Sequence, residues 1–260
     1  MTDANHGDLI LDQFTRQATV FSTAPAITDE DALQMIVEAA RPAPDDRLLD
    51  VACGPGLVVC AFAPHVREAT GIDVTPAMLD RARKLAADQG LANVVWCHGD
   101  VYSLPFSDAE FPIVTTRFSF HHFLDPAAAL REMVRVCAPG GRIVIVDDYA
   151  SEDPVKAAAF NRLEKLRDPS HSRCLTLTEL KALFGAGGLP EPDARFYELR
   201  GDVPGLLARS FPNPGDDVKI IEMFKASAAD GRLGVPVRLE RDEIYYAYPV
   251  AILAASRPAG

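Results

Sequence analysis

Short apolar runs alternate with amphipathic helical patterns through the middle of the chain. The apolar runs read RLLDVA, EATGIDV, NVVWCHGD, FPIVTTRF and GRIVIVDDY. A helical pattern between the second and third runs begins with a capping Thr75 and Pro76 and ends at Gly90. Nearly continuous apolar strands that alternate with helices indicate a parallel sheet covered on both faces. The pattern therefore predicts an α/β, doubly wound fold.

Further segments flank this alternation, and we assign all of 1–260 to one domain. The core would occupy 45–150, and its last helix and strands would occupy 176–200 and 246–260. We expect the helical pattern in 1–41 to form a lid, and 151–175 and 201–245 to be cap insertions over the ligand edge of the sheet. The last insertion is expected to run helix, turn, helix. A second role for it, as the surface of a homodimer, stays open.

Composition narrows the classes of partner. The formal net charge is −11, from 37 acidic and 26 basic residues, which argues against a nucleic-acid partner because such affinity depends on neutralising phosphates. The first ten residues, MTDANHGDLI, lack the pattern of a signal peptide, and no apolar run is long enough for a membrane span. We expect a cytoplasmic protein that acts on a small molecule.

The residues that end the predicted strands form a consistent series, because ligands of such sheets bind beyond the carboxyl ends of the strands. LLDVACGPG follows the first strand and turns through Gly54 and Gly56. Asp73 ends the second strand, seventeen residues past Gly56, where a carboxylate can accept hydrogen bonds from both hydroxyls of a ribose. Val59 occupies the place of the third glycine of a dinucleotide fingerprint, which counts against NAD.

With these motifs in order, the sequence resembles the class I S-adenosylmethionine-dependent methyltransferases. The resemblance covers about 47–147 and is carried by LLDVACGPG, GIDVTPAMLDRAR, GDVYSLPF and LREMVRVCAPGGRIVIVD. Within that superfamily the sequence most resembles small-molecule enzymes of the ubiquinone/menaquinone-biosynthesis type, and bacterial members that carry HHF after the fourth strand and RDPSH in the cap. The resemblance implies a Rossmann-like, mostly parallel seven-stranded sheet whose last strand is antiparallel.

The resemblance also implies a set of cofactor contacts. The turn would meet the methionine part of S-adenosylmethionine, Asp73 would hold the ribose, and Arg117 and Phe118 would lie beside the methionine. Met78 would pack near the adenine unless it is only core, and Asp50 would either touch the cofactor or order the turn. The complete set is Asp50, Ala52, Gly54, Gly56, Asp73, Val74, Met78, Asp100, Val101, Arg117 and Phe118.

The sulfonium of the cofactor already activates its methyl group, so a base is needed only if the acceptor must lose a proton. His121 and His122, after the fourth strand, and His171, in the cap, are the candidate bases, and each has packing as its alternative role. Asp147 and Asp148 end the fifth strand, but Arg117 stands where a magnesium site would need another acid. His and Cys show no zinc-ligand spacing. We therefore expect no metal.

The predicted activity is methyl transfer from S-adenosylmethionine to an O, N or C atom of a small, apolar or aromatic acceptor. Aromatic side chains near the ligand edge would supply the apolar walls: Phe118, Phe120, Phe123, Tyr149 and Phe160. Two alternatives stay open. One is a nicotinamide-dependent oxidoreductase on the same architecture, and the other is a non-catalytic protein that binds S-adenosylmethionine.

Overall fold

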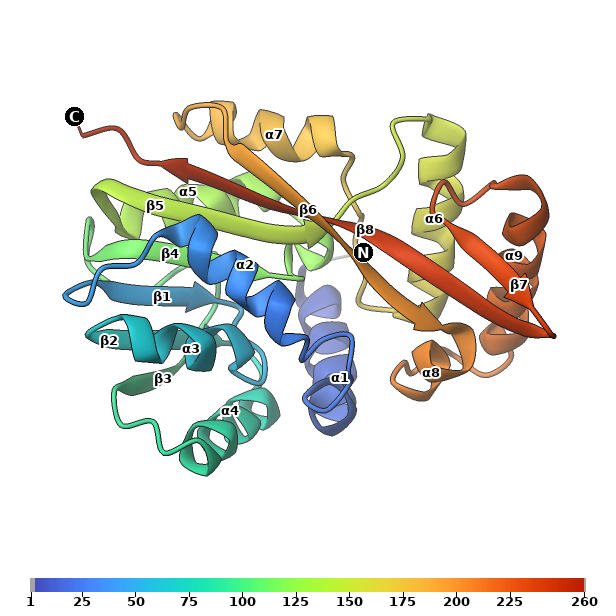
Figure 1. Ribbon diagram of the computed structural model, residues 1–260, viewed down its shortest axis with the longest axis horizontal. Coiled ribbons are helices and arrows are strands. Elements are labelled where there is room, and N and C mark those ends of the chain that lie inside the picture. Colours follow the sequence, from blue (N-terminus) through green and yellow to red (C-terminus); the bar gives the residue numbers. More distant parts are fainter. Residues whose placement is uncertain (1–2, 260) are drawn as a thin grey trace.

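A central twisted sheet organises the chain in the computed structural model, which describes residues 3–259 (Figure 1). Its main path runs β3-β2-β1-β4-β5-β8-β6, and β7 pairs with β8. The strands are β1 (Arg47–Val51), β2 (Glu68–Asp73), β3 (Val94–His98), β4 (Phe111–Arg117), β5 (Cys137–Asp148), β6 (Asp193–Asp202), β7 (Val237–Glu240) and β8 (Glu243–Ser256). The first five pair in parallel and β8 is antiparallel to β5, so the α/β fold and the antiparallel last strand are confirmed.

Several helices begin at a capping side chain, although the predicted cap Thr75 precedes Pro76 without a side-chain capping hydrogen bond. The carboxylate of Asp125 accepts a hydrogen bond from the backbone N–H of Ala128, and Thr176 forms a capping box with Glu179. The main helices are α1 (Asp3–Phe21), α2 (Glu30–Ala40), α3 (Leu57–Phe62), α4 (Pro76–Asp88), α5 (Pro126–Val136), α6 (Pro154–Arg167), α7 (Leu177–Ala186), α8 (Val203–Ala208) and α9 (Asp216–Asp230). A 3-10 turn, η2 (Phe120–His122), follows β4.

Each face of the sheet is covered by its own hydrophobic core. On one face, α2 and α3 bury Ile36 and Phe62 against the strands, and on the other α5 and α7 bury Met133 and Phe184. Figure 1 shows these two pairs of helices on opposite sides of the sheet. All residues of β1 except Arg47 are buried, as expected for a central strand covered on both sides. The packing fixes the strand ends, and therefore the loops that follow them.

The insertions form a third core beside the sheet rather than a cover over it. Phe160 of α6, Phe224 of α9 and Tyr246 of β8 belong to one buried cluster, and Figure 1 shows α6, α8, α9 and β7 grouped at one end of the molecule. The expected helix, turn and helix of 201–245 are present as α8 and α9, but β7 and β8 add an unpredicted hairpin after them. Arg241 and Asp242, both with positive φ, form its two-residue turn. The main path of the sheet has the predicted seven strands, and β7 adds an eighth beside it.

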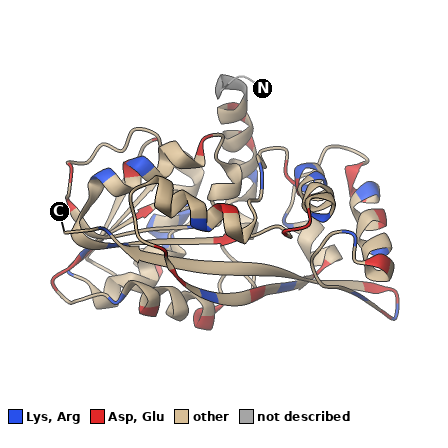
Figure 2. Cartoon of the chain, turned by 90° about the horizontal axis from the view of Figure 1, so that it is seen from above, with Lys and Arg blue, Asp and Glu red and all other residues tan. Residues whose placement is uncertain are grey.

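Charged residues of both signs are interspersed over the helices and loops (Figure 2). The acidic excess therefore does not separate into one acidic and one basic face in this view. Within residues 3–259, none of the helices is long and apolar enough to cross a membrane.

Candidate active site

A cavity of about 750 Å³ lies at the carboxyl ends of the central strands, with α1 as part of its wall. The loops after β1, β2, β3 and β4 contribute to its lining, as do α1 and the start of α5. All of the predicted cofactor residues line it except Gly56. The topology therefore brings together residues that are up to 68 positions apart in the chain, from Asp50 to Phe118.

The two glycines of the turn after β1 have different surroundings and different roles. Gly54 has a φ of 51°, and a Cβ built on it would meet no atom within 4 Å, so its face is open. Gly56 has a φ of 83°, and its Cβ would lie 2.5 Å from the Trp96 ring and 2.8 Å from Ala82. Gly54 thus leaves room for a ligand, whereas Gly56 permits the close packing of the turn against β3 and α4.

Asp73 is the carboxylate that orders this turn. Its two oxygens accept hydrogen bonds from the backbone N–H groups of Gly54 and Thr75, both at 2.8 Å. Burial raises the pKa of Asp73. Asp50, by contrast, accepts a hydrogen bond from the hydroxyl of Thr115 at 2.8 Å, and burial raises its pKa to about 7. The turn is therefore anchored to Asp73, and no bond from Asp50 to the turn is present in the described residues.

Arg117 presents unpaired donors beside the cavity. One terminal nitrogen donates to the carbonyl of Ile27 at 2.9 Å, while Nε and Nη2 are buried and have no hydrogen-bond partner within residues 3–259. The guanidinium lies 4.6 Å from the centre of the Phe118 ring. Buried donors without a partner are costly, and a carboxylate is the ligand that matches a guanidinium best.

The three candidate histidines lie close together but differ in environment. The ring centres of His121 and His122 are 4.4 Å apart, and those of His121 and His171 are 5.6 Å apart. Of the three, only His122 lines the cavity. The chemistry of this cluster therefore depends on what each ring touches on its other side.

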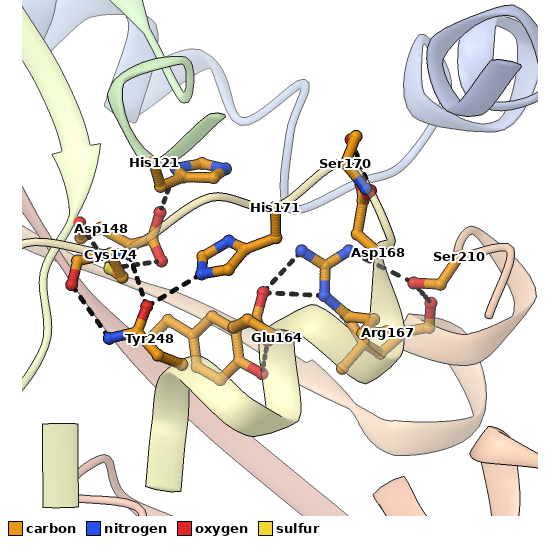
Figure 3. Close-up of polar contacts among 12 residues, drawn as sticks. His121, Asp148, Glu164, Arg167, Asp168, Ser170, His171, Cys174, Ser210 and Tyr248 are labelled. Atoms are coloured by element: carbon orange, nitrogen blue, oxygen red, sulfur yellow. Dashed lines mark hydrogen bonds and ion pairs between the residues drawn. The ribbon is translucent and has the colours of Figure 1, made fainter. Parts of the chain in front are cut away.

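His121 points away from the cavity into a pair of buried acids. Its Nδ1 lies 2.6 Å from Asp147 and 3.1 Å from Asp148, and Figure 3 shows His121 above Asp148. Burial opposes the charged imidazole, but the two carboxylates outweigh it and hold the pKa of His121 well above its usual value. His121 is a buried cation.

His171 is fully buried and is neutral. Its Nε2 lies 2.9 Å from the side-chain oxygen of Asn161, below His121 in Figure 3. Burial, with the charge of His121, lowers the pKa of His171 well below its usual value. The structure thus places His121 and His171 behind the cavity wall, where neither ring meets a molecule in the cavity.

The ligand atoms of His121, Asp147 and Asp148 lie within 4.8 Å of one another, which is close enough for a metal ion. Internal hydrogen bonds already use them. Asp147 accepts the backbone N–H groups of His121 and Asp148 besides the imidazole, and Asp148 accepts the thiol of Cys174. These bonds account for the cluster as a buried ion group. The expectation of no metal stays a prediction.

The α1 side of the cavity is formed by residues for which the sequence pattern predicted only a lid. His6, Ile10 and Phe14 of α1 line it, and their spacing of four residues is the signal that could have identified them. Of the expected aromatic walls, Phe118 and Phe123 line the cavity. The other three do not, and Phe120 and Phe160 are buried in separate hydrophobic cores. None of 151–245 lines it, so the expected cap over the cavity is replaced by α1.

Comparison with known proteins identifies the family. Residues 49–145 match the methyltransferase domain family. The uncharacterized methyltransferase YcgJ of Bacillus subtilis is 37% identical over 217 residues, which cover 84% of this chain and 85% of the relative. Its crystal structure superposes with a TM-score of 0.82 at 31% identity, covering 88% of this chain and 99% of that one.

The chain belongs to the class I S-adenosylmethionine-dependent methyltransferases. A demethylmenaquinone methyltransferase of Thermus thermophilus is also similar, at 42% identity over 104 residues, which are 39% of this chain and 46% of that protein. The match to the second relative is confined to a part of each chain. The comparisons therefore confirm the family, the enzyme class and the cofactor, while the acceptor molecule is not among the properties they share.

The residues present fit this cofactor. Gly54, with its open face, and the side chains of Asp73 and Arg117 line one cavity, and two donors of Arg117 have no hydrogen-bond partner in the described residues. S-adenosylmethionine carries a carboxylate, ribose hydroxyls and an adenine, so each of these groups has a chemically matched partner in the methyltransferase.

Proposed function

We propose that this methyltransferase acts on a small, uncharged, apolar or aromatic acceptor, at an O, N or C atom. The proposal rests on the two unlike sides of the cavity. Its charged lining residues lie at the carboxyl ends of strands or on the loops that follow them: Asp50, Asp73, Asp100, Arg117 and Asp125. The α1 side presents Ile10, Phe14 and Phe21, which suits an apolar molecule.

At the adenosine end, Asp73 would hold the ribose hydroxyls. The N–H groups of Gly54 and Thr75 each use only one lone pair of a carboxylate oxygen, so both oxygens keep capacity for a ribose hydroxyl. Met78, with Val74 and Val101, would pack against the adenine, and Asp100 would accept its amino group. These assignments agree with the position of each residue in the cavity lining.

At the methionine end, the backbone of Ala52 and Gly54 would approach the amino acid part, and Gly56 would hold the shape of the turn. The free donors of Arg117 would bind the carboxylate, with Phe118 beside it. Asp50, whose charge interacts with that of Arg117, would lie near the positive sulfonium. Cationic ligands favour an ionised carboxylate, so this acid would complement the charge that the reaction consumes.

In the transfer step, the acceptor atom forms a bond to the methyl carbon as the carbon–sulfur bond breaks. The pair of electrons from that bond stays on sulfur, which becomes the neutral thioether of S-adenosylhomocysteine. The proton that the acceptor loses would pass to Nε2 of His122, the histidine that lines the cavity. His121 and His171 would have packing and electrostatic roles, because both lie behind the wall.

The cofactor assignment is tested by calorimetry with S-adenosylmethionine and S-adenosylhomocysteine. We expect micromolar binding of both, with a loss of at least about tenfold in Asp73→Ala, since the ribose loses its charged acceptor. Asp88→Ala, an exposed acid at the end of α4, is the matched control and should bind like the wild type. Equal affinity in the two variants would contradict the role of Asp73.

The acceptor proposal is tested by transfer of a labelled methyl group to a panel of neutral phenols, anilines, alcohols and activated carbon acids, with charged analogues of each as controls. Transfer to neutral members in preference to charged ones supports the proposal, and the opposite preference contradicts it. Tight cofactor binding without transfer to any class would favour the non-catalytic alternative. Binding of reduced nicotinamide cofactor would favour the oxidoreductase.

A further inference from the structure

The segment 167–171, which reads RDPSH, lies behind His122 rather than over the cavity. It joins α6 to the stretch before α7. Asp168 and Ser170 are buried, with 1% and 0% of their surface exposed. Figure 3 shows Asp168 and Ser170 together at the end of α6, with Arg167 beneath them. Two polar side chains buried this completely must have specific partners.

The partners form a chain of hydrogen bonds that ends at His122. The hydroxyl of Ser170 lies 2.6 Å from Oδ1 of Asp168 and 3.2 Å from Nδ1 of His122. The backbone carbonyl of Ser170 also lies 3.2 Å from that Nδ1. Nδ1 of His122 is therefore within hydrogen-bond distance of both the hydroxyl and the carbonyl oxygen of Ser170.

The chemistry of these groups fixes the proton positions. A hydroxyl has one hydrogen, and an ionised carboxylate can only accept, so Ser170 donates its hydrogen to Asp168. Its oxygen and its carbonyl can then only accept from His122. Nδ1 of His122 must carry a hydrogen, and in the neutral ring Nε2 keeps a lone pair.

Asp168 is held in the ionised form that this direction requires. Burial alone would raise its pKa, but the neighbouring His122 ring, the Arg167 guanidinium and the hydrogen bonds from Ser170 and Gln17 outweigh burial and bring the pKa of Asp168 below its usual range. His122 is neutral, because burial and the charge of His121 lower its pKa to about 3. A bare Nε2 is thus present on the one histidine of the cluster that lines the cavity.

The carboxylate of Asp168 also accepts a hydrogen bond from α1. Gln17 donates to Oδ2 of Asp168 at 3.0 Å, and Nε2 of His6 lies 2.8 Å from the carbonyl oxygen of His122. The rings of Phe14 and His122 pack in a T-shaped arrangement, with ring centres 4.9 Å apart. The helix that forms the acceptor wall is therefore attached to both ends of the hydrogen-bond chain.

We propose that Asp168 and Ser170 are positioning residues that hold His122 as the Nδ1–H tautomer, with the lone pair of Nε2 directed to the acceptor. The inference rests on the proposed function for the use of that lone pair, but the tautomer is a property of the protein alone. When Nε2 takes the acceptor's proton, the imidazolium that forms keeps its Nδ1–H bond to Ser170. The carboxylate of Asp168 then stabilises the new charge.

The tautomer is tested directly by nitrogen NMR of the histidine side chains at pH 7, in the intact protein without acceptor. His122→Asn identifies the signals of this ring. We expect a neutral ring with the hydrogen on Nδ1, and S-adenosylhomocysteine should leave that state unchanged. A hydrogen on Nε2, or a charged ring at pH 7, would overturn the proposal even if methyl transfer is confirmed. Conversely, a failed acceptor search would leave this result intact.

Asp168→Asn and Ser170→Ala test the positioning role once an acceptor is found. We expect kcat to fall about tenfold or more in each, with less than about twofold change in KM and in cofactor affinity, because neither residue reaches the cavity. Asp153→Asn, at the other end of α6, keeps its capping role and is the control.

A purely structural role would give a different pattern: the variants would melt at lower temperature but keep the wild-type kcat per folded enzyme and the wild-type His122 tautomer. That combination would refute the proposal. If Asp168→Asn does not fold, the Ser170→Ala variant and the wild-type NMR measurement still decide the question.

Discussion

Replacing each of the two glycines of the turn after β1 by alanine should distinguish the glycine needed for stability from the one needed for cofactor binding. Alanine at position 56 would hold a positive φ of 83° and place its methyl group 2.5 Å from Trp96 and 2.8 Å from Ala82. Left-handed backbone costs a non-glycine residue about 1–2 kcal/mol, and overpacking costs about 1–3 kcal/mol. Gly56→Ala should therefore destabilise the protein by about 2–5 kcal/mol.

Alanine at position 54 meets only the first of these costs, because its φ is 51° and no atom lies within 4 Å of the new methyl group. The expected loss is about 1–2 kcal/mol. At about 3 °C per kcal/mol for a chain of this size, Tm should fall by about 6–15 °C in Gly56→Ala and by about 3–6 °C in Gly54→Ala.

Binding should respond in the opposite order. The methyl group added by Gly54→Ala would enter the cavity, so the Kd for S-adenosylhomocysteine should rise by about tenfold or more in this variant. Gly56 does not line the cavity, so the folded fraction of Gly56→Ala should bind within about threefold of the wild type. Thermal melts and calorimetry at 15 °C measure both quantities. An unchanged Tm in Gly56→Ala, or unchanged binding in Gly54→Ala, would refute this division of tasks.

Three further outcomes are expected. The pKa of Asp50 is about 7, and a sulfonium favours the ionised form of this acid, so affinity for S-adenosylmethionine should increase severalfold from pH 6 to pH 8. Affinity for the neutral S-adenosylhomocysteine should not change over this range. Asp50→Asn should abolish the pH dependence of S-adenosylmethionine binding. Arg117→Lys should weaken binding of both cofactor forms about tenfold, since one ammonium cannot replace a forked guanidinium, and calorimetry would show otherwise if the wild-type affinity persisted. Tyr248→Phe removes a 2.8 Å hydrogen bond to buried Glu164 and should lower the free energy of unfolding by about 1–3 kcal/mol in urea titrations, with equal midpoints counting against it.

The local sequence pattern was sufficient to predict the parallel strands, the helices between them and the cofactor end of the site. Each parallel strand can be recognised in the sequence as an apolar run. The residue at or just after its carboxyl end, such as Asp73 or Asp100, necessarily lies at the ligand edge. Regularity of this kind does not depend on distant contacts. The β7–β8 hairpin was missed because Val237 to Glu240 is short and its pairing partner is selected by tertiary packing.

The roles of the histidines required the tertiary structure. His121 and His122 are adjacent in sequence and alike in chemistry, yet one is a buried cation between Asp147 and Asp148, and the other lines the cavity. Their difference arises from partners 26 and 48 residues away. Sequence alone determined which fold, which cofactor and which edge of the sheet this protein uses. Only the packing of α1 and of the RDPSH segment decided which face of the site is apolar and which nitrogen is free, because burial and charge depend on neighbours in space.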